Sequence, residues 1–116
     1  MNYLIEKGTD VNLEDSRGVT PLMETCEHWR ENNYHIVKTL IEKGEEVNME
    51  ARNGYTPLIY ACHDRNKPIV EILIQHGAYV NKETVYNETP LHITIHHEQD
   101  KFIEKILINN GAYEKE

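Results

Sequence analysis

A chain of 116 residues is long enough for one domain of ordinary size and too short for two. Hydrophobic residues account for 39% and charged residues for 28%, which excludes the compositions typical of disordered chains. The net charge is −8, from 20 Asp and Glu against 12 Lys and Arg, and this sign disfavours nucleic acid and anionic membrane surfaces as partners.

Two short motifs recur along the chain with one period. The tripeptide Thr-Pro-Leu occurs three times, at Thr20, Thr56 and Thr89. The motif Gly-x-x-Val-Asn begins at Gly8, Gly44 and Gly77, and a last glycine, Gly111, lies near the C-terminus. The intervals are 36 and 33 residues in the first series and 36, 33 and 34 in the second. Two independent motifs with the same period indicate an array of repeats.

Each period predicts two helices. The first begins at Thr-Pro, because the Thr hydroxyl can cap free amides and Pro at the first helical position loses no needed donor. Paired apolar residues at helical spacing predict the second helix: Ile36, Val37, Leu40 and Ile41; Ile69, Val70, Leu73 and Ile74; and Ile103, Ile106 and Leu107. A glycine that adopts the left-handed conformation is expected to end it, at Gly44, Gly77 and Gly111. Tight turns before Thr-Pro-Leu are predicted at Gly18, Gly54 and Asn87.

This combination resembles the ankyrin repeat, which has a Thr-Pro-Leu-His-x-Ala signature and a length of about 33 residues. The matching segments are 20–26, 56–62 and 89–95, and the third alone keeps the His, at His92. The resemblance implies an all-α fold, an ankyrin repeat solenoid of stacked antiparallel helix pairs with β-hairpin-like turns. We expect a partial repeat over 1–14, with a second helix and turn only, and repeats over 15–50, 51–83 and 84–116. Between its helices the first repeat carries three extra residues, within 29–33, and the third carries one, near Gln99.

In ankyrin proteins the hairpin tips and first helices line a concave face that binds partner proteins, and the resemblance implies the same for this chain. From the tips, the candidate partner-binding residues are Arg17, Val19, Arg52, Asn53, Tyr55, Tyr86 and Glu88. From the first helices, they are Glu27, His28, His63, Asp64, His96 and His97. Two of them, Tyr55 and Tyr86, could act as rigid anchors or pack against the neighbouring hairpin.

Three glutamates, Glu14, Glu50 and Glu83, occupy one position in successive repeats, just before each turn. They either keep the surface soluble or form a negative stripe that attracts a basic partner. Arg17 and Arg52 lie beside them in the sequence and moderate that field. A basic protein partner is therefore one candidate.

Metal binding and catalysis are both disfavoured. Ligand atoms of a tetrahedral zinc lie about 2.0 to 2.1 Å from the metal, whereas the first-helix histidines belong to repeats roughly 8 to 10 Å apart. We therefore expect no metal and no cofactor. The sequence contains no nucleophile beside a base, no paired carboxylates in a pocket and no glycine-rich phosphate loop, so we do not expect an enzyme. Cys26 and Cys62 are expected to be buried free thiols, too far apart for a disulfide.

A structural role is the alternative hypothesis. The chain would then be a segment of a larger scaffold, or would self-associate through its unpaired N-terminal end around Tyr3, Leu4 and Ile5. No run approaches the roughly 20 apolar residues that a membrane span needs. We therefore expect an intracellular protein, cytoplasmic or nuclear, with no membrane partner.

Overall fold

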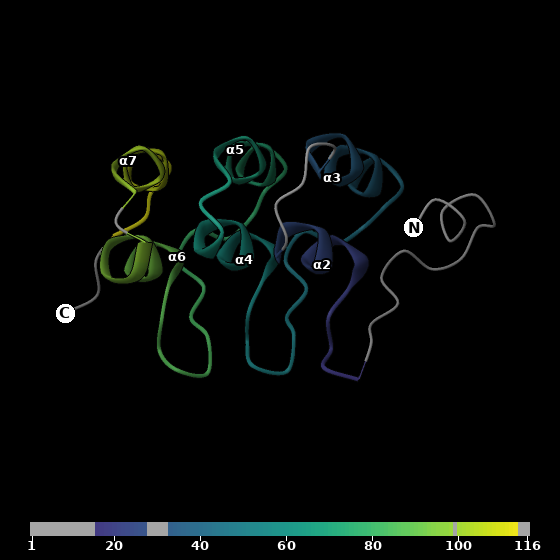
Figure 1. Cartoon of the computed structure of the whole chain (residues 1–116), viewed down its shortest axis with the longest axis horizontal. Helices are drawn as coiled ribbons and strands as arrows, with labels where there is room; N and C mark the ends of the chain where they lie inside the picture. Colours follow the sequence, from purple (N-terminus) through teal and green to yellow (C-terminus); the bar gives the residue numbers. More distant parts are fainter. Residues whose placement is uncertain (1–15, 28–32, 99, 114–116) are drawn as a thin grey trace.

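The computed structural model describes residues 16–27, 33–98 and 100–113, and all regular elements within these ranges are helices. In chain order they are α2 (Pro21–Glu27), α3 (Asn33–Glu42), α4 (Pro57–His63), α5 (Lys67–Gln75), α6 (Pro90–Ile93), the π-helix η1 (Thr94–Glu98) and α7 (Lys101–Asn109). Figure 1 shows α2, α4 and α6 in one row and α3, α5 and α7 in a second, with the hairpin loops extending away from the second row. The predicted all-α stack of helix pairs is confirmed. The predicted partial repeat over 1–14 and residues 28–32 of the first insertion lie outside the described residues, and the repeat boundaries stay predictions.

The Thr-Pro helix starts are present in all three repeats. The hydroxyl oxygens of Thr20, Thr56 and Thr89 accept hydrogen bonds from the backbone N–H groups three residues later, across 3.3, 3.3 and 3.1 Å. Each hydroxyl thereby satisfies one of the amides that a helix start leaves without a partner.

The second helices have caps that the repeat motifs did not reveal. Asn66 accepts a hydrogen bond from the backbone N–H of Ile69, and Asp100 accepts from those of Phe102 and Ile103. These caps fix where α5 and α7 begin.

One continuous core lies between the two rows of helices. The apolar residues predicted for the second helices supply its centre, with Val37, Leu40, Ile69, Val70, Leu73, Ile103 and Leu107 at most 1% exposed. Leu22, Leu58 and Leu91 from the Thr-Pro-Leu motifs are buried against them. α4 contacts both α2 and α6, so the described residues of the three repeats share this core.

The turn positions also follow the prediction. Gly44, Gly77 and Gly111 all have positive φ just after a second helix, and Asn87 takes the place of Gly18 and Gly54 with φ 61°. At Gly54 the close approach of the next tip matters as well, because a Cβ there would lie 2.9 Å from the backbone nitrogen of Val85. The side chain of Asn87 is exposed, and within the described residues no hairpin follows to meet it. Of the three described hairpin tips, the third is therefore the one whose turn accommodates a side chain.

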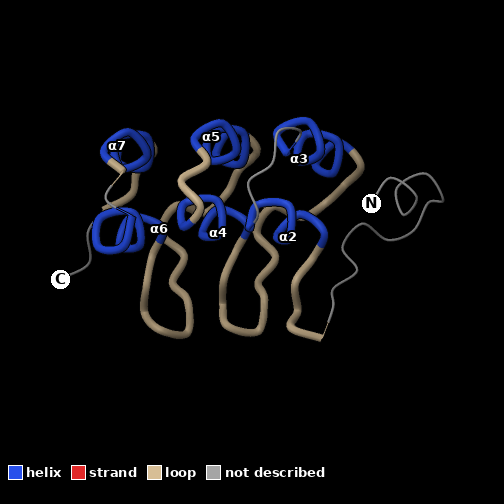
Figure 2. The backbone as a smooth tube through the Cα atoms, viewed as in Figure 1, coloured by secondary structure: helices blue, strands red, loops and turns tan. Residues whose placement is uncertain are grey.

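The hairpin tips are joined to one another through the backbone. The N–H of Arg52 donates to the carbonyl of Arg17, and the N–H of Val85 donates to the carbonyl of Asn53, both across 3.0 Å. Figure 2 shows the three tips side by side, away from the second helices. The tips thus form one continuous edge of the molecule.

The extra residue of the third repeat is absorbed inside a helix. The cap Asn66 follows Thr56 by ten residues, whereas Asp100 follows Thr89 by eleven. After α6 the backbone widens into the π-helix η1, which accommodates one more residue in the turn. Gln99, near which the sequence places the extra residue, lies outside the described residues, and the described backbone widens just before it, over Thr94–Glu98.

The described helices are short. None of them is both long enough and apolar enough to cross a bilayer.

Candidate partner-binding groove

A groove of about 670 Å³ lies beside the first two hairpin tips and α4. Its lining residues are Ser16, Arg17, Val19, Ala51, Arg52, Asn53, Tyr55, Tyr60 and His63. Six of the partner-binding candidates are among them: Arg17, Val19, Arg52, Asn53, Tyr55 and His63. This volume is in the range of pockets that hold small ligands or a few side chains. Arg17 and His63, which are 46 positions apart in the sequence, therefore share one surface.

Local hydrogen bonds hold the second tip in one conformation. The N–H of Ala51 donates to the carbonyl of Tyr55 and the N–H of Gly54 to the carbonyl of Ala51, each across 2.9 Å. The side-chain oxygen of Asn53 accepts from the N–H of Tyr55 across 3.0 Å, an Asx turn. The rim of the groove at this tip is therefore pre-organised.

Two tyrosines form the aromatic wall of the groove. The ring centroids of Tyr55 and Tyr60 are 5.1 Å apart with planes tilted by 53°, a favourable aromatic arrangement. Tyr60 is 8% exposed, whereas Tyr55 is half-buried. Burial, followed by the nearby Glu88 and Tyr86, raises the pKa of Tyr55, so its hydroxyl keeps its proton and can donate a hydrogen bond. Tyr55 packs on its own repeat and still presents an edge to the groove.

Tyr60 was not among the residues singled out from the sequence. It follows Thr-Pro-Leu-Ile in the second repeat, at the position that Ile93 occupies in the third. An aromatic residue there reads as core, and only the folded tip shows that its ring also lines the groove.

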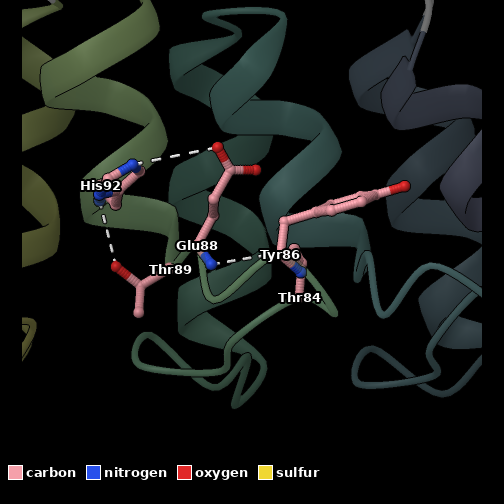
Figure 3. A network of polar contacts seen from close by, with 5 residues as sticks. All are labelled: Thr84, Tyr86, Glu88, Thr89 and His92. Carbon is pink, nitrogen blue, oxygen red and sulfur yellow. Dashed lines mark hydrogen bonds and ion pairs between the residues drawn. The ribbon is translucent and has the colours of Figure 1, made fainter.

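The third tip carries a second group of candidates outside this groove. The hydroxyl oxygen of Thr84 accepts from the N–H groups of Tyr86 and Glu88, across 3.1 and 3.3 Å (Figure 3). The carboxylate of Glu88 lies 3.9 Å from Nε2 of His92, an ion pair when the imidazole is protonated. Tyr86 is 65% exposed, and Figure 3 shows its ring extending away from His92. The ring of Tyr86 is therefore accessible.

The first-helix candidates fall into two sets. His63 and His96 are exposed as expected, Asp64 is half-buried, and the ring of His96 lies 4.5 Å from that of His92. Glu27 and His97 belong to α2 and η1, but their side chains, like the whole of His28, lie outside the described residues. In the part of the chain that the structure describes, no group of three or more His, Cys, Asp or Glu residues is placed to hold a metal ion.

The charges near the groove are distributed unevenly. Two arginines and a histidine line it, and none of the lining residues that the structure describes is acidic. Glu50, from the predicted glutamate stripe, forms an ion pair with Lys82 at 2.9 Å. This pairing reduces the net charge of the stripe, of which Glu14 lies outside the described residues. Attraction of a basic partner by these glutamates stays a prediction.

The comparisons with known proteins identify the repeats. A family model of three ankyrin repeats matches the chain twice, over the overlapping residues 1–84 and 29–115. No curated protein matches the chain. Ankyrin repeats are generally protein–protein interaction modules, and the family is typically non-enzymatic.

Proposed function

Because the chain belongs to the ankyrin repeat family, we propose that it binds a partner protein across its hairpin tips and first helices, with the groove beside α4 as the centre of contact. The observation that carries this proposal is the gathering of six candidate residues in one groove with a rigid rim. A rigid rim reduces the conformational entropy lost on binding.

Two aromatic residues are the proposed anchors. Tyr55 is held against Tyr60 at the wall of the groove, and Tyr86 is exposed at the next tip. Tyrosines of this kind often dominate interface energies, because a large ring is buried at a small cost in side-chain entropy. Asn53, half-buried at the second tip, would then complete the contact, whereas Val19 is only 4% exposed and belongs to the core.

Affinity capture from a native lysate tests the proposal. We expect the protein to retain a partner that the double variant Tyr55→Ala, Tyr86→Ala retains at least about tenfold less. Tyr79→Ala is the matched control, because Tyr79 is 63% exposed and lies after α5, outside the groove. Circular dichroism of each variant checks that the helices remain. A partner held equally by all three proteins would contradict the proposal.

A further inference from the structure

The groove differs in charge from the rest of the molecule. The whole chain carries 20 acidic against 12 basic residues, yet the described residues that line the groove include two arginines and no acidic residue. The guanidinium of Arg52, on one surface of an otherwise acidic protein, presents a local positive charge there. That charge favours negative groups of a partner at this surface.

The two arginines are brought together by the stacking of the tips. The backbone bond from Arg52 N–H to the Arg17 carbonyl, 3.0 Å long, places the two residues directly beside each other on adjacent tips. The Cγ of Arg52 would lie 3.3 Å from a Cβ at position 18, so the stem of Arg52 runs over Gly18 on the first tip. Both side chains are exposed.

The charge of Arg52 is available to a ligand. Among the described residues Arg52 forms no ion pair. Glu50, two residues before it, is directed to Lys82 instead, at 2.9 Å. A guanidinium that pairs with no carboxylate of the protein can bind a carboxylate of a ligand. The two planar groups then form two parallel hydrogen bonds.

Beside the arginines lies an apolar surface. It is formed largely by core residues that are almost buried, with Val19 4% exposed, Ala51 6% and Tyr60 8%, and the half-buried Tyr55 supplies its accessible part. A ligand that fits both halves of the groove carries a carboxylate next to an aliphatic or aromatic side chain.

We propose that the groove binds an acidic segment of a partner protein, with an Asp or Glu carboxylate held between Arg17 and Arg52 and a neighbouring apolar side chain against Tyr55 and Tyr60. This inference rests on the proposed function and adds the chemical class of the partner. It also separates the groove from the predicted glutamate stripe, which would attract the opposite charge.

Selection of short random peptides displayed on phage, with the whole chain as bait, tests the inference without a known partner. We expect the selected peptides to be enriched in Asp or Glu next to apolar residues. Arg52→Gln is expected to weaken these peptides at least about tenfold, and Arg52→Lys to restore only part of the affinity, since Lys lacks the bidentate geometry. Lys105→Gln, an exposed residue of α7 with the same loss of charge, is the matched control and should leave binding unchanged.

The outcomes separate this inference from the proposed function. Neutral or basic peptides whose binding is lost in Tyr55→Ala would overturn the acidic partner and support the groove as a binding site. Acidic peptides that bind Arg52→Gln and Lys105→Gln equally would overturn the inference, because general charge attraction would explain them. Selection of no peptide would also overturn it. Peptides that bind Tyr55→Ala and Arg52→Gln as tightly as they bind the parent protein would contradict the proposed function and the inference together.

Discussion

The side-chain amide of Asn48 is hydrogen-bonded to the repeat that follows it: its oxygen accepts from the backbone N–H of Tyr79 across 2.8 Å, and its nitrogen donates to the carbonyl of Gly77 across 3.0 Å. Asn81 makes the same two bonds one repeat later, to Tyr113 and Gly111. This explains the Asn of the Gly-x-x-Val-Asn motif, because one amide satisfies a donor and an acceptor that the turn after a helix leaves open.

Replacing this amide should weaken the joint between repeats. We expect Asn48→Ala to lower the free energy of unfolding by about 1 to 2 kcal/mol, because two backbone groups lose partners at a partly exposed site. Asn48→Asp keeps the acceptor for Tyr79 but not the donor for Gly77, so its cost should be intermediate. Urea unfolding followed by circular dichroism measures both. Asn109→Ala, at an exposed position of α7, is the control, and a loss at Asn48 no larger than at Asn109 would refute the role of the amide.

Two glycines with positive φ should respond differently to a methyl group. Gly54→Ala and Gly77→Ala both place an alanine in a left-handed conformation, which costs roughly 1 to 2 kcal/mol. A Cβ at Gly77 meets nothing within 4 Å, whereas one at Gly54 lies 2.9 Å from the backbone of Val85. We therefore expect Gly54→Ala to cost about 1 to 3 kcal/mol more, because the third tip must move. Equal losses in urea unfolding would show that the tips are not tightly packed.

The sequence predicts those parts of the fold that depend on local chemistry. Thr56 with its Pro begins a helix, and Gly77 ends one, because capping and backbone conformation act within a few residues. The period then places each apolar face toward the same core. By contrast, Arg65 has φ 56° after α4, where an ordinary side chain gives no sign of a left-handed residue.

Six residues of the candidate groove were predicted from the sequence, but its shape was not. Position within the repeat identified Arg17 and Arg52 separately, since each follows from the family pattern. Their proximity depends on a backbone bond between residues 35 positions apart, and the wall depends on the ring of Tyr60 meeting that of Tyr55. Such contacts follow from the stacking of repeats and side-chain packing, which periodicity does not describe.

Core truncation should destabilise the whole array. Leu73 is 0% exposed in the continuous core, so Leu73→Ala is expected to cost about 2 to 5 kcal/mol through lost burial and the cavity left behind. Ile108→Ala, at a residue that is 49% exposed on α7, should cost less than about 1.5 kcal/mol. Thermal unfolding of both variants measures the difference, and a similar loss in the two would contradict the assignment of the core.

Buried thiols should make the protein less stable in alkaline solution. Burial raises the pKa of Cys62 from its ordinary value of 9.0 to about 12, partly offset by a hydrogen bond with Thr94 and reinforced by Asp100. The folded protein therefore keeps this proton at a pH where the unfolded chain has lost it. The stability contribution is fully present below pH 9 and is lost as the pH rises from 9 toward 12, at up to about 1.4 kcal/mol per pH unit. Burial raises the pKa of Cys26 as well, so it contributes with the same sign.

Urea unfolding of the protein and of Cys62→Ala, at pH 7, 9 and 10, isolates this contribution. Between pH 9 and 10 we expect the parent to lose about 1 kcal/mol more than the variant, because one titrating thiol has been removed from the unfolded state. The comparison uses the change with pH, so the small cavity made by the substitution cancels. Parallel pH dependence in the two proteins would mean that Cys62 ionises as readily in the folded chain as in the unfolded one, and that the α4 face on which it lies is open to water.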